Sequence, residues 1–187
     1  MEEIRIKTKE VLDRVEKAPD GSFLLRVRSF VKFAQQQREP FGKILVEELE
    51  AQYQAFKAEK NFTGAAEYAL ICALWKCPTR EAVPVLSKIF VENPTAGREE
   101  IAQIFRDLGD PRAVKPLLSV LDTLDDNNDI GGHLRSAIAE ALGAIGDSYA
   151  LPALRRLEVT PSDDNKKIAR YAKWAIEQLE SRPPNRD

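Results

Sequence analysis

The hydrophobic pattern of this 187-residue chain has the spacing of an α-helix along most of its length. From residue 66 onward, four segments carry apolar residues at three matching positions, with offsets of four and then three residues. Such offsets place side chains on one face of a helix, so each segment predicts a helix with one buried side. These positions hold Leu70, Ile101, Ile138 and Ala172, then Leu74, Phe105, Leu142 and Ile176, then Cys77, Leu108, Ile145 and Leu179.

A short phrase follows these segments and recurs almost unchanged. It reads LGDPRAVKPLL at residues 108–118 and IGDSYALPALR at residues 145–155, with a weaker copy, TREAVPVLSKI, further upstream. Aligned on Ala82, Ala113 and Ala150, the copies are 31 and 37 residues apart, which is typical of two-helix repeats. The pattern therefore predicts an array of helix pairs, closed by a last segment that lacks its second helix.

The corner between the two helices of a pair has its own residue signature. Gly109 and Gly146 follow the last apolar residue of a helix, where a left-handed backbone favours glycine. Asp110 and Asp147 come next and are suited to cap the following helix through a side-chain oxygen. Each copy therefore predicts a helix, a tight corner and a second helix, and the corner residues are explained by structure alone.

Upstream of residue 64 the repeated phrase fades, but helical periodicity continues. Helices are predicted over residues 3–17, 22–37 and 41–59. We expect one continuous domain, in which residues 1–63 form divergent N-terminal helices that cap the stack, residues 64–181 form the repeats, and residues 182–187 form a disordered tail. In all, the chain predicts about ten helices and no sheet.

The copy that begins at Leu134 follows the unit VRxxAxxALGxIGDxxAxPxLxxxL. The matching residues are Leu134, Arg135, Ile138, Ala141, Leu142, Gly143, Ile145, Gly146, Asp147, Ala150, Pro152 and Leu154. This unit resembles the HEAT-like repeat of the phycobilisome-lyase type. The resemblance implies an all-α fold, a right-handed α-solenoid of antiparallel helix pairs like HEAT and armadillo superhelices. It also implies that Arg98 and Arg135 form a ladder with Asp110 and Asp147 between repeats.

The charge balance disfavours nucleic-acid binding. The chain has 28 Lys and Arg residues against 30 Asp and Glu residues, for a net charge of −2, whereas nucleic-acid binders usually carry a basic excess. No segment is long and apolar enough to span a membrane, and the charged N-terminus lacks the features of a secretory signal, so we expect a cytoplasmic protein. Cys72 and Cys77 fit that compartment as reduced thiols on one helix.

The chain offers no complete set of catalytic or metal-binding residues, and we expect neither a metal nor a cofactor. His133 is its single histidine; without a second histidine or a cysteine cluster, neither a zinc site nor a hydrolase triad can be assembled. Asp125, Asn127 and Asp129 mimic the first ligands of a calcium loop, but Ile130 stands where that loop needs glycine. We interpret this acidic segment as a solvated insertion, and an enzymatic activity stays open but is not favoured.

A surface for binding is expected on the helices of the LRSAIAEALG type, which line the concave face in solenoids of this kind. Four positions on each of these helices are expected to point away from the core. They hold Tyr68, Ala69, Cys72 and Lys76, then Glu99, Glu100, Gln103 and Asp107, then Ser136, Ala137, Glu140 and Ala144, and finally Arg170, Tyr171, Trp174 and Gln178. The middle of this surface is acidic, and its C-terminal end is aromatic and basic.

We therefore favour a non-catalytic interaction or scaffold module that binds a protein partner on its concave face. Aromatic residues and arginine are over-represented among binding hot spots. The predicted partner-binding residues are Tyr68, Gln103, Glu140, Arg170, Tyr171 and Trp174. The last three form the preferred patch.

Two alternatives follow from resemblance. The lyase-type repeat implies an enzyme or chaperone that acts on a bilin, a tetrapyrrole whose propionates Arg170 could bind beside Tyr171 and Trp174. A weaker alternative is a HEAT-like DNA glycosylase, which would need a basic concave surface. The acidic middle repeats disfavour this last interpretation.

Overall fold

The computed structural model describes residues 2–17, 21–37, 41–58, 64–125, 129, 132–159 and 166–181. Within these residues the chain forms ten α-helices and no strand. The helices are α1 (Glu2–Glu16), α2 (Phe23–Gln35), α3 (Phe41–Lys57), α4 (Ala65–Lys76), α5 (Val83–Glu92), α6 (Arg98–Leu108), α7 (Val114–Leu121), α8 (His133–Ile145), α9 (Leu151–Glu158) and α10 (Lys166–Glu180). Short 3₁₀ turns, η1 (Arg80–Ala82), η2 (Pro111–Ala113) and η4 (Ser148–Ala150), precede α5, α7 and α9.

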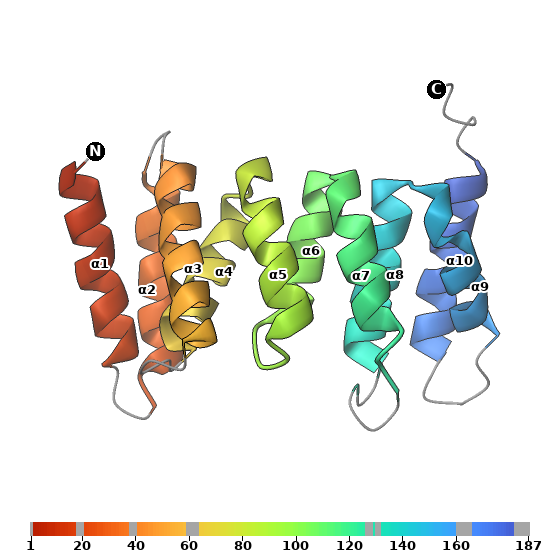
Figure 1. Cartoon of the computed structure of the whole chain (residues 1–187), viewed down its shortest axis with the longest axis horizontal. Coiled ribbons are helices and arrows are strands. Elements are labelled where there is room, and N and C mark those ends of the chain that lie inside the picture. Colours follow the sequence, from red (N-terminus) through yellow and green to blue (C-terminus); the bar gives the residue numbers. More distant parts are fainter. Residues whose placement is uncertain are drawn as a thin grey trace.

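The helices stand side by side in one long row with the two termini at opposite ends (Figure 1). The helices α2, α4, α6, α8 and α10 pack against one another in succession and form what we call the even layer. The other layer, the odd layer, consists of α3, α5, α7 and α9. From α6 to α10 the helices of the even layer lie closer together than α5, α7 and α9 do. The chain is an all-α solenoid, as the sequence predicts.

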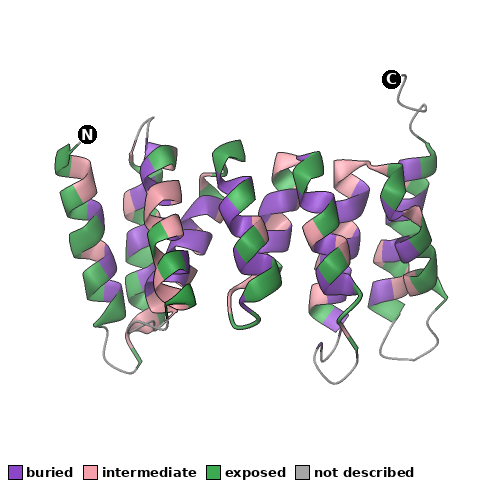
Figure 2. Cartoon of the chain, viewed as in Figure 1, coloured by how far each residue is buried: buried purple, intermediate pink, exposed green. Residues whose placement is uncertain are grey.

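The repeated apolar stripe forms the core between the two layers. All residues at its first two positions are buried, from Leu70 and Leu74 in α4 to Ala172 and Ile176 in α10. At the third position Leu179 is buried, whereas Cys77, Leu108 and Ile145 are half-buried at the helix ends. Figure 2 shows the buried residues concentrated in the middle of the row, while the terminal helix α1 is mostly exposed. The predicted stripe is therefore confirmed.

The corners confirm the predicted roles of glycine and aspartate. Gly109 and Gly146 end α6 and α8 in the left-handed region, at φ 57° and 86°. The Asp110 side chain accepts a hydrogen bond from the Arg112 backbone N–H at 3.0 Å, and Asp147 accepts one from Tyr149 N–H at 2.9 Å. The aspartates thus cap the short 3₁₀ turns that lead into α7 and α9.

The Arg–Asp ladder expected from the resemblance is wrong. Arg98 donates to the backbone oxygens of Phe90 and Val91, at 2.7 and 3.0 Å. Arg135 instead binds Asp129, with 2.9 Å between Nε and Oδ2. Both arginines lie in the first turn of their helix, where their side chains reach the end of the preceding helix or loop instead of an aspartate of a neighbouring repeat.

The N-terminal region agrees with the predicted helices within a few residues. The observed bounds, 2–16, 23–35 and 41–57, compare with the predicted 3–17, 22–37 and 41–59. The helix α1 packs against α2 and α4, which joins this region to the repeats. The predicted tail at residues 182–187 lies outside the described residues. Among the described helices, none combines the length and apolar character needed to cross a membrane.

Candidate partner-binding face

The exposed side of the even layer carries most of the residues predicted to point away from the core. Two of those positions are wrong: Ala69 in α4 is fully buried, and Ser136 in α8 is 2% exposed. The Ser136 hydroxyl donates to the backbone oxygen of Gly132 at 2.7 Å. A helix of the even layer touches the odd layer and both of its neighbours, so its buried arc is wider than a single stripe.

Tyr68, the first of the six predicted binding residues, links α4 to α6. Its hydroxyl donates to Oε1 of Glu100 at 2.9 Å. Its ring lies against Gly97, where an added Cβ would come within 3.0 Å of the tyrosine Cε2. Tyr68 is half-buried, and burial is the main reason why its pKa is raised well above the ordinary value. Its side chain positions the start of α6 rather than standing free in the solvent.

Two further predicted residues, Gln103 and Glu140, lie on α6 and α8 and are half-buried. Glu140 accepts from Arg106 Nη1 at 3.0 Å, and Arg106 also contacts Asp107 at 2.8 Å. This arginine bridges α6 and α8 and neutralises part of the acidic surface that the sequence predicts there.

The aromatic patch at the C-terminal end lies on α10 as predicted. The guanidinium of Arg170 is 5.2 Å from the ring centroid of Tyr171, and Trp174 is 38% exposed. An added Cβ at Gly143 would come within 2.9 Å of Trp174 Cζ3 and 2.7 Å of Ala175 Cα. The indole therefore lies on the bare backbone of α8. The structure spreads the six residues along four helices, and their role in binding stays a prediction.

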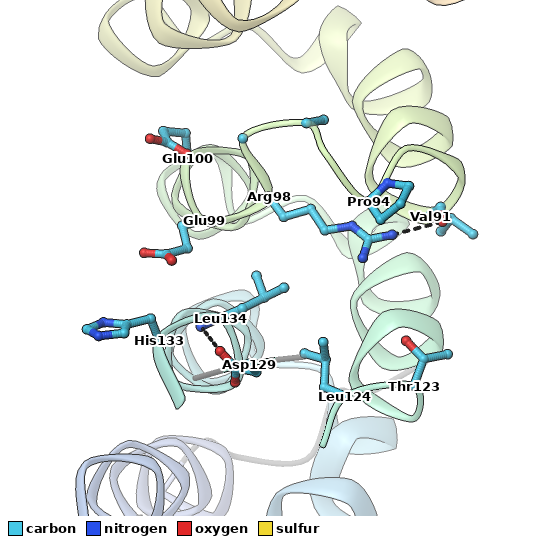
Figure 3. A pocket seen from close by; sticks show the side chains of 12 residues that line it. Val91, Pro94, Arg98, Glu99, Glu100, Thr123, Leu124, Asp129, His133 and Leu134 are labelled. Atoms are coloured by element: carbon cyan, nitrogen blue, oxygen red, sulfur yellow. Dashed lines mark hydrogen bonds between the residues drawn. The ribbon is translucent and has the colours of Figure 1, made fainter. Parts of the chain in front are cut away.

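A cleft of about 720 Å³ opens between the first turns of α6 and α8. Residues from three helices and two loops line it: Val91, Pro94, Ala96, Gly97, Arg98, Glu99, Glu100, Thr123, Leu124, Asp129, His133 and Leu134. Glu99 on α6 and His133 on α8 lie on the same side of the cleft, one on each wall, while Arg98 extends to the other side toward Val91 (Figure 3). The guanidinium of Arg98 is thus directed away from the carboxylates.

The two carboxylates of the cleft have no cationic partner among the described residues. Glu99 is exposed and makes no hydrogen bond or ion pair there, and Glu100 accepts only from the Tyr68 hydroxyl. His133 Nδ1 lies 3.3 Å from Nζ of Lys167, the second residue of α10. Sequence reasoning placed Glu99 and Glu100 on the exposed face but missed the cleft, because its opposite wall comes from the segment that follows α7 and from the start of α8.

Asp129, at the base of this cleft, binds groups at the N-terminal end of α8. Its carboxylate accepts from the backbone N–H groups of Leu134 and Arg135, at 2.9 and 3.0 Å, and from Arg135 Nε. The two side chains are 4% and 8% exposed. Asp129 is therefore a helix cap and an ion-pair partner rather than a calcium ligand, while Asn127 lies outside the described residues.

No group of three histidine, cysteine, aspartate or glutamate side chains in the described part of the chain is arranged to hold a metal ion. Both cysteines are free thiols. Burial raises the pKa of Cys72 to about 11, which keeps this thiol protonated and a poor nucleophile near neutral pH.

The repeat, the glycine corners and the two helical layers define a class of protein. Residues 83–177 match the family of HEAT repeats, and the chain belongs to this family. The phycobilisome-lyase type of the repeat is not confirmed. The bilin and DNA-glycosylase alternatives, the partner-binding role and the cytoplasmic location stay predictions.

Two curated relatives share sequence with this chain. A deoxyhypusine hydroxylase of Schizosaccharomyces pombe is 32% identical over 84 residues, which are 45% of this chain and 25% of that protein. A deoxyhypusine hydroxylase of Rattus norvegicus is 26% identical over 152 residues, 80% of this chain and 44% of that protein. The chain thus spans less than half the length of these relatives. No solved structure matches it.

Proposed function

We propose that this chain is a HEAT-repeat binding module whose even layer binds a partner polypeptide and takes a primary amine of the partner, such as a lysine side chain, into the cleft between α6 and α8. The observation that carries the proposal is a cleft of about 720 Å³, into which Glu99 is directed while Glu100 lies at its edge beside Tyr68 (Figure 3); neither carboxylate has a cation beside it in the described residues. An ammonium group supplies the missing charge and several hydrogen-bond donors.

The charges along the even layer favour one orientation of the partner. Acidic residues gather on α6, whereas Lys167 and Arg170 on α10 are basic. A partner with a basic group near α6 and an acidic group near α10 meets complementary charge at both places, and complementarity of this kind gives specificity and a faster approach.

The aromatic patch on α10 extends the same surface. Trp174 lies on Gly143, ten residues along α8 from His133 at the cleft, a distance of about 15 Å at the rise of an α-helix. An extended segment of about five residues covers that distance. A short partner segment can therefore contact the cleft and the exposed indole at the same time.

The direct test measures binding of a fluorescein-labelled decalysine peptide at low salt by fluorescence anisotropy. Replacing both cleft carboxylates by Glu99→Gln and Glu100→Gln removes the charge and keeps the acceptor for Tyr68. With two partly exposed charge pairs lost, the affinity is expected to fall about fivefold to tenfold.

The matched control is the double variant Glu3→Gln and Glu10→Gln on α1, where both residues are exposed. It changes the net charge by the same amount at a distance from the cleft. If the two double variants lower the affinity equally, the peptide responds only to the net charge of the chain. That result rejects the cleft as the binding site.

The two relatives are deoxyhypusine hydroxylases, which raises hydroxylation as a second function. Inserting oxygen into a C–H bond requires an oxygen-activating group, commonly iron held by two histidines and a carboxylate. The chain has one histidine, and the described residues bring together no group of three metal-binding side chains. This donor set does not fit such a metal.

A further inference from the structure

A buried carboxyl group lies in α4 beneath the wall of the cleft. Glu67 is 1% exposed. Its Oε1 accepts from Asn93 Nδ2 at 2.9 Å, whereas its Oε2 has no hydrogen-bond partner in the described structure. Burying an ionised carboxylate with one incomplete hydrogen-bond shell is unfavourable. Burial raises the pKa of Glu67 to about 7, although the hydrogen bond from Asn93 acts in the opposite direction.

Asn93 connects this carboxyl to the cleft. It is itself 1% exposed and lies in the turn between α5 and α6. Its Oδ1 accepts from the backbone N–H and the hydroxyl of Thr95, at 3.1 and 2.7 Å. The same turn supplies Pro94, Ala96 and Gly97 to the cleft lining. The hydrogen bond between Asn93 and Glu67 therefore affects the conformation of one wall of the cleft.

The next residue of α4 holds the same wall from the other side. Tyr68 packs against Gly97 and donates to Glu100. Two successive residues of α4 thus attach the turn and the first turn of α6. Of these two residues, Glu67 is the one whose carboxyl group changes charge near neutral pH.

No charged side chain offsets the Glu67 carboxyl. Burial and the Asn93 hydrogen bond are the two influences on its pKa, so α1, α2, α3 and α6, which pack against α4, bring no cation or second carboxylate to bear on it among the described residues. Glu100 of α6 acts on Tyr68 and Cys72 instead. Arg98 is occupied by the carbonyls of Phe90 and Val91.

We propose that Glu67 is a positioning residue: its protonated form holds the α5–α6 turn in place, so that the cleft binds an amine more tightly below neutral pH than above it. The binding part of this statement rests on the function proposed above. When Glu67 loses its proton, the buried charge favours a displaced turn that admits water to the carboxylate. The displaced turn no longer forms the wall beside Glu99 and Glu100.

The direction of this effect separates it from simple charge attraction. A protonated His133 in the lining would repel an amine in acid, and protonating Glu99 or Glu100 would weaken the attraction. Both of these titrations predict weaker binding at low pH. Tighter binding at low pH therefore points to the wall of the cleft rather than to its surface charge.

The first experiment follows the wall without any ligand. The backbone amide shifts of Thr95 and Gly97 and the ¹³C shift of the Glu67 carboxyl are recorded by NMR from pH 5.5 to 8.5. We expect all three to change with one midpoint near pH 7. In Glu67→Gln, which keeps an acceptor for Asn93 without a charge, the two amides should not show this transition.

The control variant for this experiment is Glu177→Gln, an exposed glutamate of α10, which should leave the transition unchanged. A wild-type carboxyl that titrates near the ordinary value for glutamate overturns the proposal without the need for a variant. Amide transitions that persist in Glu67→Gln also overturn it, because another group then moves the turn.

The second experiment measures decalysine affinity at pH 6 and pH 8. A carboxyl with a pKa near 7 is about 90% ionised at pH 8, so the wild type should bind up to about tenfold more weakly there than at pH 6. In Glu67→Gln the two affinities should differ by less than about twofold.

The two proposals fail in distinguishable ways. Absence of decalysine binding at either pH, with the amide transition present, rejects the cleft as an amine site but keeps the titrating wall. Binding with the same pH ratio in wild type and Glu67→Gln rejects the role of Glu67 but keeps the cleft.

Discussion

Two joints of the even layer, α6 with α8 and α8 with α10, both pack closely, but one has a tight contact near the C-terminal end of α8 and the other has a cleft between the first turns of its helices. At the α8–α10 joint Gly143 has no side chain, and Ala175 and Trp174 lie directly on its backbone. At the α6–α8 joint the first turns are separated by a cleft lined with Glu99, Arg98 and His133. A residue without a side chain allows close contact at one joint, whereas charged residues line the gap at the other.

The largest expected effect comes from breaking the ion pair at the base of the cleft. Arg135→Met leaves Asp129 buried without its guanidinium, so the free energy of unfolding should fall by about 4 kcal/mol. The control is Arg155→Met, which breaks the exposed pair with Glu180 and should cost less than about 1 kcal/mol. Urea denaturation followed by circular dichroism gives both values, and a similar small loss in the two variants would show that the buried pair is dispensable.

The pH dependence of stability is the next largest effect. The pKa of Glu67 rises from 4.5 to about 7 on folding, which corresponds to about 3 kcal/mol. Because the folded-state pKa is the higher one, this stability is fully present below about pH 4.5 and is lost as the pH rises through 7.

Urea denaturation of wild type and Glu67→Gln at pH 5 and pH 8 checks this sign. The variant should be more stable than wild type at pH 8 and closer to it at pH 5. Contacts with Arg112 lower the pKa of Asp110 to about 2. Asp110 therefore affects the free energy of unfolding in the opposite direction, and only in stronger acid. A wild type that gains stability relative to the variant between pH 5 and pH 8 would contradict the prediction.

Closing space at the tight joint should have a smaller but clear effect. Gly143→Ala places a methyl group 2.7 Å from the backbone of Ala175, and the forced separation of α8 and α10 should cost about 2 kcal/mol. Gly42→Ala is the matched control, because the atoms nearest to its methyl group would be those of Thr79, at 3.5 Å and beyond. That variant should be stabilised by about 0.5 kcal/mol. Thermal unfolding of both proteins measures the difference, and equal behaviour would mean that the joint relaxes freely.

The smallest effect concerns the aromatic patch beside the tight joint. Trp174→Ala together with Tyr171→Ala should weaken binding of a partner isolated with the wild-type chain about tenfold, or about 1.4 kcal/mol. Tyr149→Ala in η4 is the control, since Tyr149 is 68% exposed and lines a pocket with residues of α7 and α9 rather than of α10. Surface plasmon resonance compares the three proteins. Full binding by the double variant would remove α10 from the interface.

Much of the fold could be predicted because its signals are local in the sequence. The stripe through Leu70 and Leu74 needs only helical spacing, and Gly109 and Gly146 take the left-handed backbone for which glycine is best suited. The exposed surface was predicted less well. Ala69 and Ser136 are buried because flanking helices cover more than one stripe, and such lateral packing leaves no periodic signal in the chain.

The candidate site was predictable only in part, for a related reason. Glu99 and Glu100 could be placed on an exposed helix face, but the cleft also needs Leu124 and His133 from beyond the α7 helix. The aromatic residues Tyr171 and Trp174 were found by residue type. Tyr68 is bound to Glu100, and Glu140 to Arg106. These pairs depend on which helices become neighbours in the fold.

By itself the sequence determined the repeat, the alternation of helices and corners, and the identity of most core residues, because helical period and glycine conformation act over a few residues. Only the tertiary structure decided which partner each charge received. It paired Arg135 with Asp129 rather than with an aspartate of a neighbouring repeat, left Glu67 buried with one unsatisfied oxygen, and opened a cleft beside two unneutralised carboxylates. These outcomes depend on distances between segments 26 or more residues apart or on the path of a single loop, and neither is encoded in local spacing.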